Sequence, residues 1–124
     1  METKEILSHI DHTQLKPYAT LEDVYKLCDE AVTYGTASVC IPPCYVRRVH
    51  DRYGSKLNIC PVVGFPLGYS VTAAKLAETR QAIEDGAQEI DMVINISDVK
   101  NGDYDKVEQE IIALKAECGN RILK

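Results

Sequence analysis

Short apolar runs alternate with helical patterns along the chain. Three runs, TASVCIPP, LNICPVVGFP and QEIDMVINI, are rich in β-branched residues and are typical of buried strands. Between them, apolar residues recur every three or four positions, as on one face of an amphipathic helix. The pattern therefore predicts strands and helices in alternation, and RILK at residues 121–124 begins a further apolar strand.

The helical stretches have clear end signals. The first has Thr20 as N-cap and Asp23 three residues later, a capping-box-like start, and it stops at Gly35. A later one has Ser70 as its expected N-cap and stops at Gly86. We expect the buried face of this later helix to be Ala73, Leu76, Ala77, Arg80 and Ile83. The other two helical stretches are CYVRRVHDRYG and DYDKVEQEIIALKAECG.

Strands that alternate with helices through short connections indicate a parallel sheet built from βα units. Pro61 is an awkward member of its strand if that strand is central, because proline has no amide hydrogen to donate. About four strands could form a small doubly wound domain or part of a (β/α)₈ TIM-type barrel. The chain stops on the opening residues of a core strand, which favours the barrel. We expect one α/β domain over residues 1–124, a half-barrel of about four βα units with the start of a fifth strand.

Composition narrows the class of protein. Hydrophobic residues make up 45% and charged residues 27%, which is average for a folded soluble domain. The net charge is −5 and no basic run is present, so we expect no nucleic-acid partner. No apolar run approaches the roughly 20 residues that span a bilayer, and METKEILSHI lacks a signal-peptide core. We expect no membrane partner and a cytoplasmic location.

The cysteines point to reduced thiols. They are Cys28, Cys40, Cys44, Cys60 and Cys118, an odd number without a secretion signal. No C-x-x-C pair is present, and none of the 3 histidines is spaced from a cysteine as a zinc motif requires. We expect no metal site, and we interpret the cysteines as buried or spare thiols.

Polar side chains gather where the predicted strands end, which is where parallel α/β folds place their functional groups. On the last complete strand, Asp91, Val93 and Asn95 share one face, and Ile90, Met92 and Ile94 lie on the other, against the helices. In a barrel Asp91 becomes an interior carboxylate, where an unpaired charge is costly. A structural role, with a salt bridge or bonds to backbone amides, and a functional role both remain open.

The stretch VVGFPLGYS resembles a phosphate-cradling glycine turn only weakly. It has neither G-x-x-x-x-G-K-[ST] nor G-x-G-x-x-G, so a tight strand-to-helix turn is the better interpretation. No G-x-S-x-G elbow and no H-E-x-x-H helix is present.

Four stretches together resemble one family. HIDHTQLKPYAT, SVCIPPCYV, VVGFPLGYS and EIDMVIN are similar, in order and spacing, to the signatures of deoxyribose-phosphate aldolase, from near residue 9 to the end of the chain. The resemblance implies a class I aldolase on a TIM barrel, acting in deoxyribonucleotide catabolism. Such an enzyme cleaves a small phosphorylated sugar, 2-deoxyribose 5-phosphate, to acetaldehyde and glyceraldehyde 3-phosphate through a lysine Schiff base. It uses no metal and no organic cofactor. The implied strands lie near 9–13, 36–41, 58–64 and 88–95, with 121–124 entering the fifth.

The resemblance also implies roles for individual residues. Asp91 matches the family's strand-four aspartate, which donates and accepts protons in the catalytic relay. Asp11 and Thr13 match first-strand positions that line the pocket, and Cys40 matches the second-strand cysteine near it. The chemistry is coherent, because an amine must be neutral to attack a carbonyl and carbinolamine dehydration needs a proton shuttle.

The family's lysines fall beyond the matched part. The resemblance places the Schiff-base lysine on strand six, the activating lysine on strand seven, and phosphate-binding glycine loops after strands seven and eight. Lys16 and Lys75 match no nucleophile position, and Lys124 could point inward but is a poorly positioned terminal residue. We expect the chain alone to be inactive. The alternative to an aldolase half is a non-catalytic half-barrel fragment that self-associates.

A half-barrel leaves two open sheet edges and, we expect, an apolar inner face that invites pairing. The apolar residues expected in the unclosed layers are Val39, Ile41, Val62, Val63, Val93, Ile122 and Leu123. Two copies related by a two-fold axis could supply roughly eight strands. The sequence therefore predicts a homo-oligomer, most simply a dimer.

Overall fold

The computed structural model describes all residues from 1 to 124. Its strands form one parallel sheet in the order β1-β2-β3-β4-β5, so that each strand lies beside the next one in the sequence. The strands are β1 (Asp11–Thr13), β2 (Ser38–Ile41), β3 (Ile59–Val63), β4 (Glu89–Met92) and β5 (Ile122–Leu123). The prediction of an α/β fold with a parallel sheet is confirmed.

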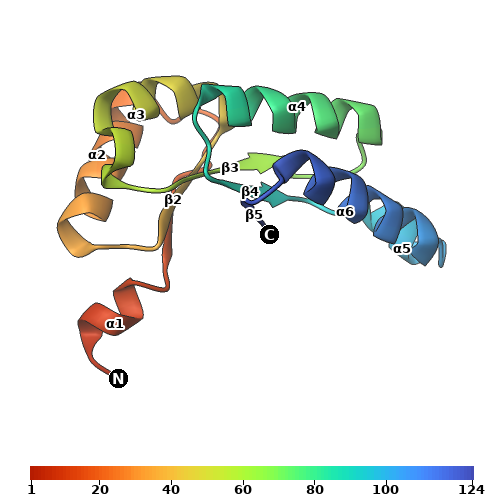
Figure 1. Cartoon of the computed structure of the whole chain (residues 1–124), viewed down its shortest axis with the longest axis horizontal. Coiled ribbons are helices and arrows are strands. Elements are labelled where there is room, and N and C mark those ends of the chain that lie inside the picture. Colours follow the sequence, from red (N-terminus) through yellow and green to blue (C-terminus); the bar gives the residue numbers. More distant parts are fainter.

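Helices link consecutive strands and pack on one face of the sheet (Figure 1). In chain order, the helices of the whole structure are α1 (Thr3–Leu7), which precedes the first strand, α2 (Leu21–Tyr34), η1 (Pro43–Tyr45), α3 (Val46–Tyr53), η2 (Gly54–Lys56), α4 (Thr72–Asp85), α5 (Ile96–Lys100) and α6 (Tyr104–Cys118). The short helix α1 has no buried residue and extends away from the sheet at the N-terminus (Figure 1). None of the helices has the length and apolar character needed to cross a bilayer.

Helix α2 begins and ends where its sequence signals predicted. The Thr20 side chain accepts a hydrogen bond from the Asp23 amide, and the Asp23 carboxylate accepts one from the Thr20 amide. This reciprocal capping box satisfies two amides that the first helical turn leaves without partners. At the other end Gly35 adopts the left-handed conformation, which glycine tolerates because it has no Cβ.

Helix α4 differs from its prediction in both start and face. It begins at Thr72 with Val71 as N-cap, and the expected cap Ser70 makes no capping bond. The expected buried face was right for Leu76 and Ile83, which pack against the core, and wrong for Ala73, Ala77 and Arg80, which are exposed. The residues buried on this helix are Lys75, Thr79 and Ala82. Two polar side chains can face the sheet because both are satisfied: Thr79 Oγ1 donates to the Lys75 carbonyl, and the Lys75 ammonium has partners inside the fold.

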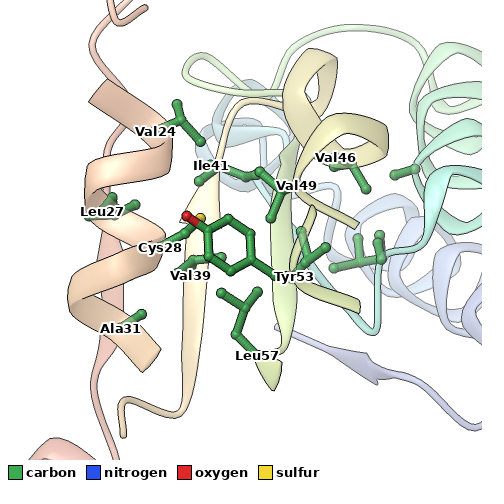
Figure 2. Packing of buried hydrophobic residues seen from close by; sticks show 14 of the residues in the cluster. Val24, Leu27, Cys28, Ala31, Val39, Ile41, Val46, Val49, Tyr53 and Leu57 are labelled. Carbon is green, nitrogen blue, oxygen red and sulfur yellow. The ribbon is translucent and has the colours of Figure 1, made fainter. Parts of the chain in front are cut away.

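The hydrophobic core lies between the sheet and its helices. Val39 and Ile41 of β2 are fully buried against Val24 of α2 and Val49 of α3 (Figure 2). Full burial of such side chains contributes about 1.5–3 kcal/mol each relative to exposure. On β4, Ile90 lies in this core and Met92 packs against it, as predicted. The same prediction was wrong for Ile94, which lies beyond the end of β4 at Met92 and is 38% exposed. The expected apolar inner face was wrong in this respect, because Val39, Ile41 and Val63 all belong to the helix-covered side.

Pro61 lies in the middle of the central strand β3. It is paired in register with Ile41 of β2, while the register with β4 begins only at Val62, opposite Asp91. Proline can occupy this position because one strand neighbour keeps its pairing while the other starts one residue later.

Candidate active site on the inner face of the sheet

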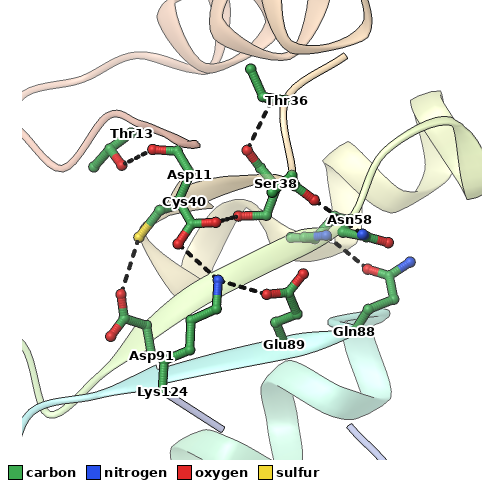
Figure 3. Close-up of polar contacts among 12 residues, drawn as sticks. Asp11, Thr13, Thr36, Ser38, Cys40, Asn58, Gln88, Glu89, Asp91 and Lys124 are labelled. Carbon is green, nitrogen blue, oxygen red and sulfur yellow. Dashed lines mark hydrogen bonds and ion pairs between the residues drawn. The ribbon is translucent and has the colours of Figure 1, made fainter. Parts of the chain in front are cut away.

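The face of the sheet opposite the helices is polar and charged. Alternate positions on the strands bring together side chains from both ends of the chain (Figure 3). The side chains that interact there are Asp11, Ser38, Cys40, Glu89, Asp91 and Lys124. Three of these, Asp11, Cys40 and Asp91, were predicted as site residues.

Asp91 is half-buried on β4, and its contact is with a thiol. Cys40 Sγ donates to Asp91 Oδ2 across 3.8 Å (Figure 3). Burial, and after it the charge of Asp91, raises the pKa of the Cys40 thiol to about 11. The thiol is therefore neutral at physiological pH and acts as a weak donor rather than as a nucleophile. Asp91 itself makes no ion pair with any lysine or arginine of the chain.

Asp11 and Thr13 lie on β1, which pairs with the β2 strand that carries Cys40. Ser38 Oγ donates to Asp11 Oδ1 at 2.7 Å, and Lys124 Nζ donates to Asp11 Oδ2 at 2.7 Å. Thr13 is exposed, donates to the Asp11 backbone oxygen at 2.7 Å, and stands opposite Cys40 in the β1–β2 register. The structure thus brings all four predicted site residues to one region of the inner face.

Lys124 links β1 to β4 across the inner face of the sheet. Besides Asp11, its ammonium contacts Glu89 Oε1 at 2.7 Å, and the Glu89 side chain is only 7% exposed. Burial lowers the pKa of Lys124, but the bonds to the two carboxylates outweigh it and raise the pKa above its usual 10.5. The same ammonium, with Ser38, holds the pKa of Asp11 below its usual 3.8 although burial raises it. Lys124 is therefore a structural cation, fixed in its protonated form.

Sequence reasoning missed Glu89 and Ser38. Glu89 precedes Asp91 by two residues and Ser38 precedes Cys40 by two, so strand alternation alone places each pair on one face. That signal was sufficient to find both. Cys60 stands opposite Cys40 in the β2–β3 register, and burial raises the pKa of its thiol above the usual 9.0. No group of three or more His, Cys, Asp and Glu side chains is arranged to hold a metal ion.

The segment after β3 forms a tight turn into α4, as predicted. The Gly68 amide donates to the Gly64 carbonyl at 2.8 Å, and Glu78 Oε1 accepts from the Gly64 amide at 2.8 Å. A cavity of about 320 Å³ lies within the turn and the start of α4. A Cβ added to Gly68 would lie 2.1 Å from the Ile94 carbonyl oxygen, so the turn packs directly on the end of β4.

Residues 5–124 match the family model described as DeoC/LacD family aldolase. The chain belongs to this aldolase family. A deoxyribose-phosphate aldolase of Clostridium botulinum is 65% identical over 124 residues, and one of Clostridioides difficile is 54% identical over 121 residues. These matches cover 100% and 98% of this chain but 56% and 55% of the relatives. The chain therefore spans about half the length of the curated aldolases it matches.

Solved structures of aldolases share this fold. A candidate deoxyribose-phosphate aldolase from Coccidioides immitis has a TM-score of 0.93 at 37% identity, covering 99% of this chain and 49% of that one. A tetrameric deoxyribose phosphate aldolase from Aeropyrum pernix has a TM-score of 0.73 at 28% identity, covering 97% of this chain and 63% of that one. The sheet and helices described above are the architecture of about half of a TIM-barrel aldolase of this family.

Proposed function

We propose that this chain supplies the first half of a deoxyribose-phosphate aldolase barrel together with its proton-relay carboxylate, Asp91. The proposed reaction is cleavage of 2-deoxyribose 5-phosphate to acetaldehyde and glyceraldehyde 3-phosphate through a lysine Schiff base, without metal or organic cofactor. The setting would be deoxyribonucleotide catabolism in the cytoplasm. The relatives named as deoxyribose-phosphate aldolases support the substrate class.

The single observation that carries the proposal is the environment of Asp91. Its carboxylate lies on the inner face, half-buried, with a neutral thiol as neighbour and no cation bound to it. A carboxylate in that state is free to accept a proton from a substrate and to return it. Asp11, by contrast, is held ionised by Lys124 and Ser38, which suits a residue that lines a pocket rather than one that shuttles protons.

We also propose that no lysine among residues 1–124 forms the imine with the substrate. An amine attacks a carbonyl only when it is neutral. Lys124 points to the inner face but its raised pKa keeps it protonated. Lys75 is fully buried on the helix side and paired with Glu110, and Lys16 is exposed in the connection between β1 and α2. The polypeptide of 124 residues should therefore show no aldolase activity alone.

The test is imine trapping. The chain is incubated with acetaldehyde and borohydride, and peptide mass spectrometry then locates any ethylated lysine. We expect no site-specific adduct on the folded chain. A stoichiometric adduct on Lys124 or Lys16 would overturn the assignment of the imine to a lysine outside these residues.

We further propose that the isolated chain self-associates as a homodimer through its sheet edges. β1 and β5 each have one strand neighbour only, and Ile122 on β5 is 53% exposed. Unpaired strand edges are templates for pairing with another chain. The inner faces of two copies should repel each other. Each face carries one ammonium, Lys124, and three carboxylates, Asp11, Glu89 and Asp91, so its net charge is 1 − 3 = −2. Salt should therefore strengthen the dimer by screening this repulsion.

Light scattering at micromolar concentration tests the dimer, and two matched variants test the interface. Ile122→Lys places a charge on the β5 edge, whereas Ile112→Lys alters an equally exposed residue on α6. We expect Ile122→Lys to give monomers and Ile112→Lys to leave the dimer intact. A folded, monomeric parent chain would defeat the dimer proposal, and equal behaviour of the two variants would defeat the edge interface.

A further inference from the structure

Lys75 is the largest side chain that the fold buries completely. It lies on α4, where its ammonium contacts Glu110 Oε1 of α6 at 2.5 Å. The Glu110 side chain is only 9% exposed, and its second oxygen, Oε2, accepts a hydrogen bond from Thr72 Oγ1 at 2.7 Å. A lysine is rarely buried without a partner, because the desolvated charge is costly. The contacts among Lys75, Glu110 and Thr72 offset that cost. The Lys75 ammonium also makes one further contact, outside these two helices.

That further contact is with the end of β4. Lys75 Nζ donates to the Val93 carbonyl oxygen at 2.9 Å. The Val93 amide donates to the Val63 carbonyl of β3, also at 2.9 Å. Val93 is thus held from both sides, by the neighbouring strand and by the buried ammonium. It lies two residues after Asp91, on the stretch that leads out of the sheet.

The turn before α4 rests on the same lysine. A Cβ added to Gly64 would lie 2.9 Å from Lys75 Cε, so the lysine stem fills the space beneath the turn. Gly68, in the same turn, packs directly against Val93 and Ile94. The turn, the start of α4, and the exit of β4 therefore share Lys75 as a common contact. An apolar side chain of equal length could fill this space but could not bond the Val93 oxygen.

We propose that Lys75 is a positioning residue, which, held by Glu110, fixes the end of β4 and thereby the place of the Asp91 carboxylate on the inner face. Its importance for catalysis rests on the relay role proposed for Asp91. The placement itself does not, since it follows from contacts within this chain. Without the ammonium, the exit of β4 keeps its bond to Val63 but loses its anchor on the helix side.

The test uses the full chain and compares two pairs of substitutions. Lys75→Met with Glu110→Gln removes the ammonium without leaving an unpaired buried carboxylate. Arg80→Met with Glu117→Gln is the matched control, because it removes the other ion pair between α4 and α6 and touches no strand. The readouts are the melting temperature, hydrogen exchange of the Val93 amide, and the 13Cγ chemical shift of Asp91 at pH 7. The Val39 amide, which donates to the Asn58 carbonyl oxygen just before β3, is the internal reference.

We expect the Lys75 pair of substitutions to fold, to raise Val93 exchange at least ~10-fold, and to shift the Asp91 signal while Val39 is unchanged. The control pair should alter none of these. A folded Lys75 variant with parental Val93 exchange and an unmoved Asp91 signal would overturn the proposal. Should that variant not fold, scalar coupling between Lys75 15Nζ and the Val93 carbonyl carbon is measured in the parent chain, where its presence supports the anchor and its absence refutes it. Aldolase activity enters none of these readouts, so failure of the proposed function would be seen separately.

Discussion

Replacing Lys124 by methionine removes the cation that ties β5 to β1 and β4. Two contacts of 2.7 Å are lost, to Asp11 and to Glu89. A hydrogen bond to a charged group contributes about 1.5–3 kcal/mol to stability. The Lys124 side chain is 32% exposed, so water screens part of this contribution. We expect Lys124→Met to lower the free energy of unfolding at pH 7 by about 2 kcal/mol for both contacts together. For a domain of this size the melting temperature should fall by about 6–8 °C.

The pH dependence gives this prediction a second, independent readout. The folded pKa of Asp11 lies below its usual 3.8, so its share of the stability is present above that pH and is lost as the pH falls below it. The folded pKa of Lys124 lies above its usual 10.5, so its share is fully present below that pH and is lost only above it. The difference between parent and Lys124→Met should therefore persist from about pH 4 to about pH 10.5 and shrink below pH 3.8.

Urea unfolding at several pH values measures both effects. Lys56→Met is the control, because Lys56 is exposed and forms no ion pair. It should change stability by less than about 0.5 kcal/mol at every pH. A Lys124→Met chain as stable as the parent at pH 7, or a difference that stays constant into strong acid, would refute the ion-pair reasoning.

Two further substitutions follow from the inner face and the turn. Asp91→Asn should change stability by less than about 0.5 kcal/mol in thermal melts, because Asp91 has no ion-pair partner. It should also lower the pKa of Cys40, read from the pH dependence of alkylation, though to no less than the usual 9.0 because burial is the larger cause. Gly68→Ala should destabilise by more than about 2 kcal/mol, since its Cβ would meet the Ile94 oxygen. Gly102→Ala shares the positive φ but meets nothing within 4 Å, so it should cost clearly less.

Local sequence patterns predicted the elements of this fold well. Strand alternation identified Asp91 as an inner-face residue, and the Thr20 and Asp23 pair located the start of α2 to the residue. Both signals act within a few positions of the chain, through backbone geometry that does not depend on distant contacts. The same holds for Gly35, which ended the helix as expected.

The errors arose where distant residues decide the outcome. Lysine is rarely buried, so the pattern of α4 placed Lys75 outside, although Glu110, 35 residues later, gives it a buried partner. The charged inner face likewise depends on Lys124 meeting Asp11, 113 positions earlier. Val39 and Ile41 were expected on that face because a run of apolar residues does not show which side the helices cover.

The most direct test of the account is an activity measurement on a fused chain. Residues 1–124 are joined to the part of the Clostridium botulinum relative that this chain does not cover, and cleavage of 2-deoxyribose 5-phosphate is measured. We predict no activity for residues 1–124 alone, clear activity for the fusion, and a loss of at least ~100-fold when the fusion carries Asp91→Asn. Cleavage by residues 1–124 alone, or full activity of the Asp91→Asn fusion, would contradict the central claim that this half contributes the relay carboxylate and not the imine-forming lysine.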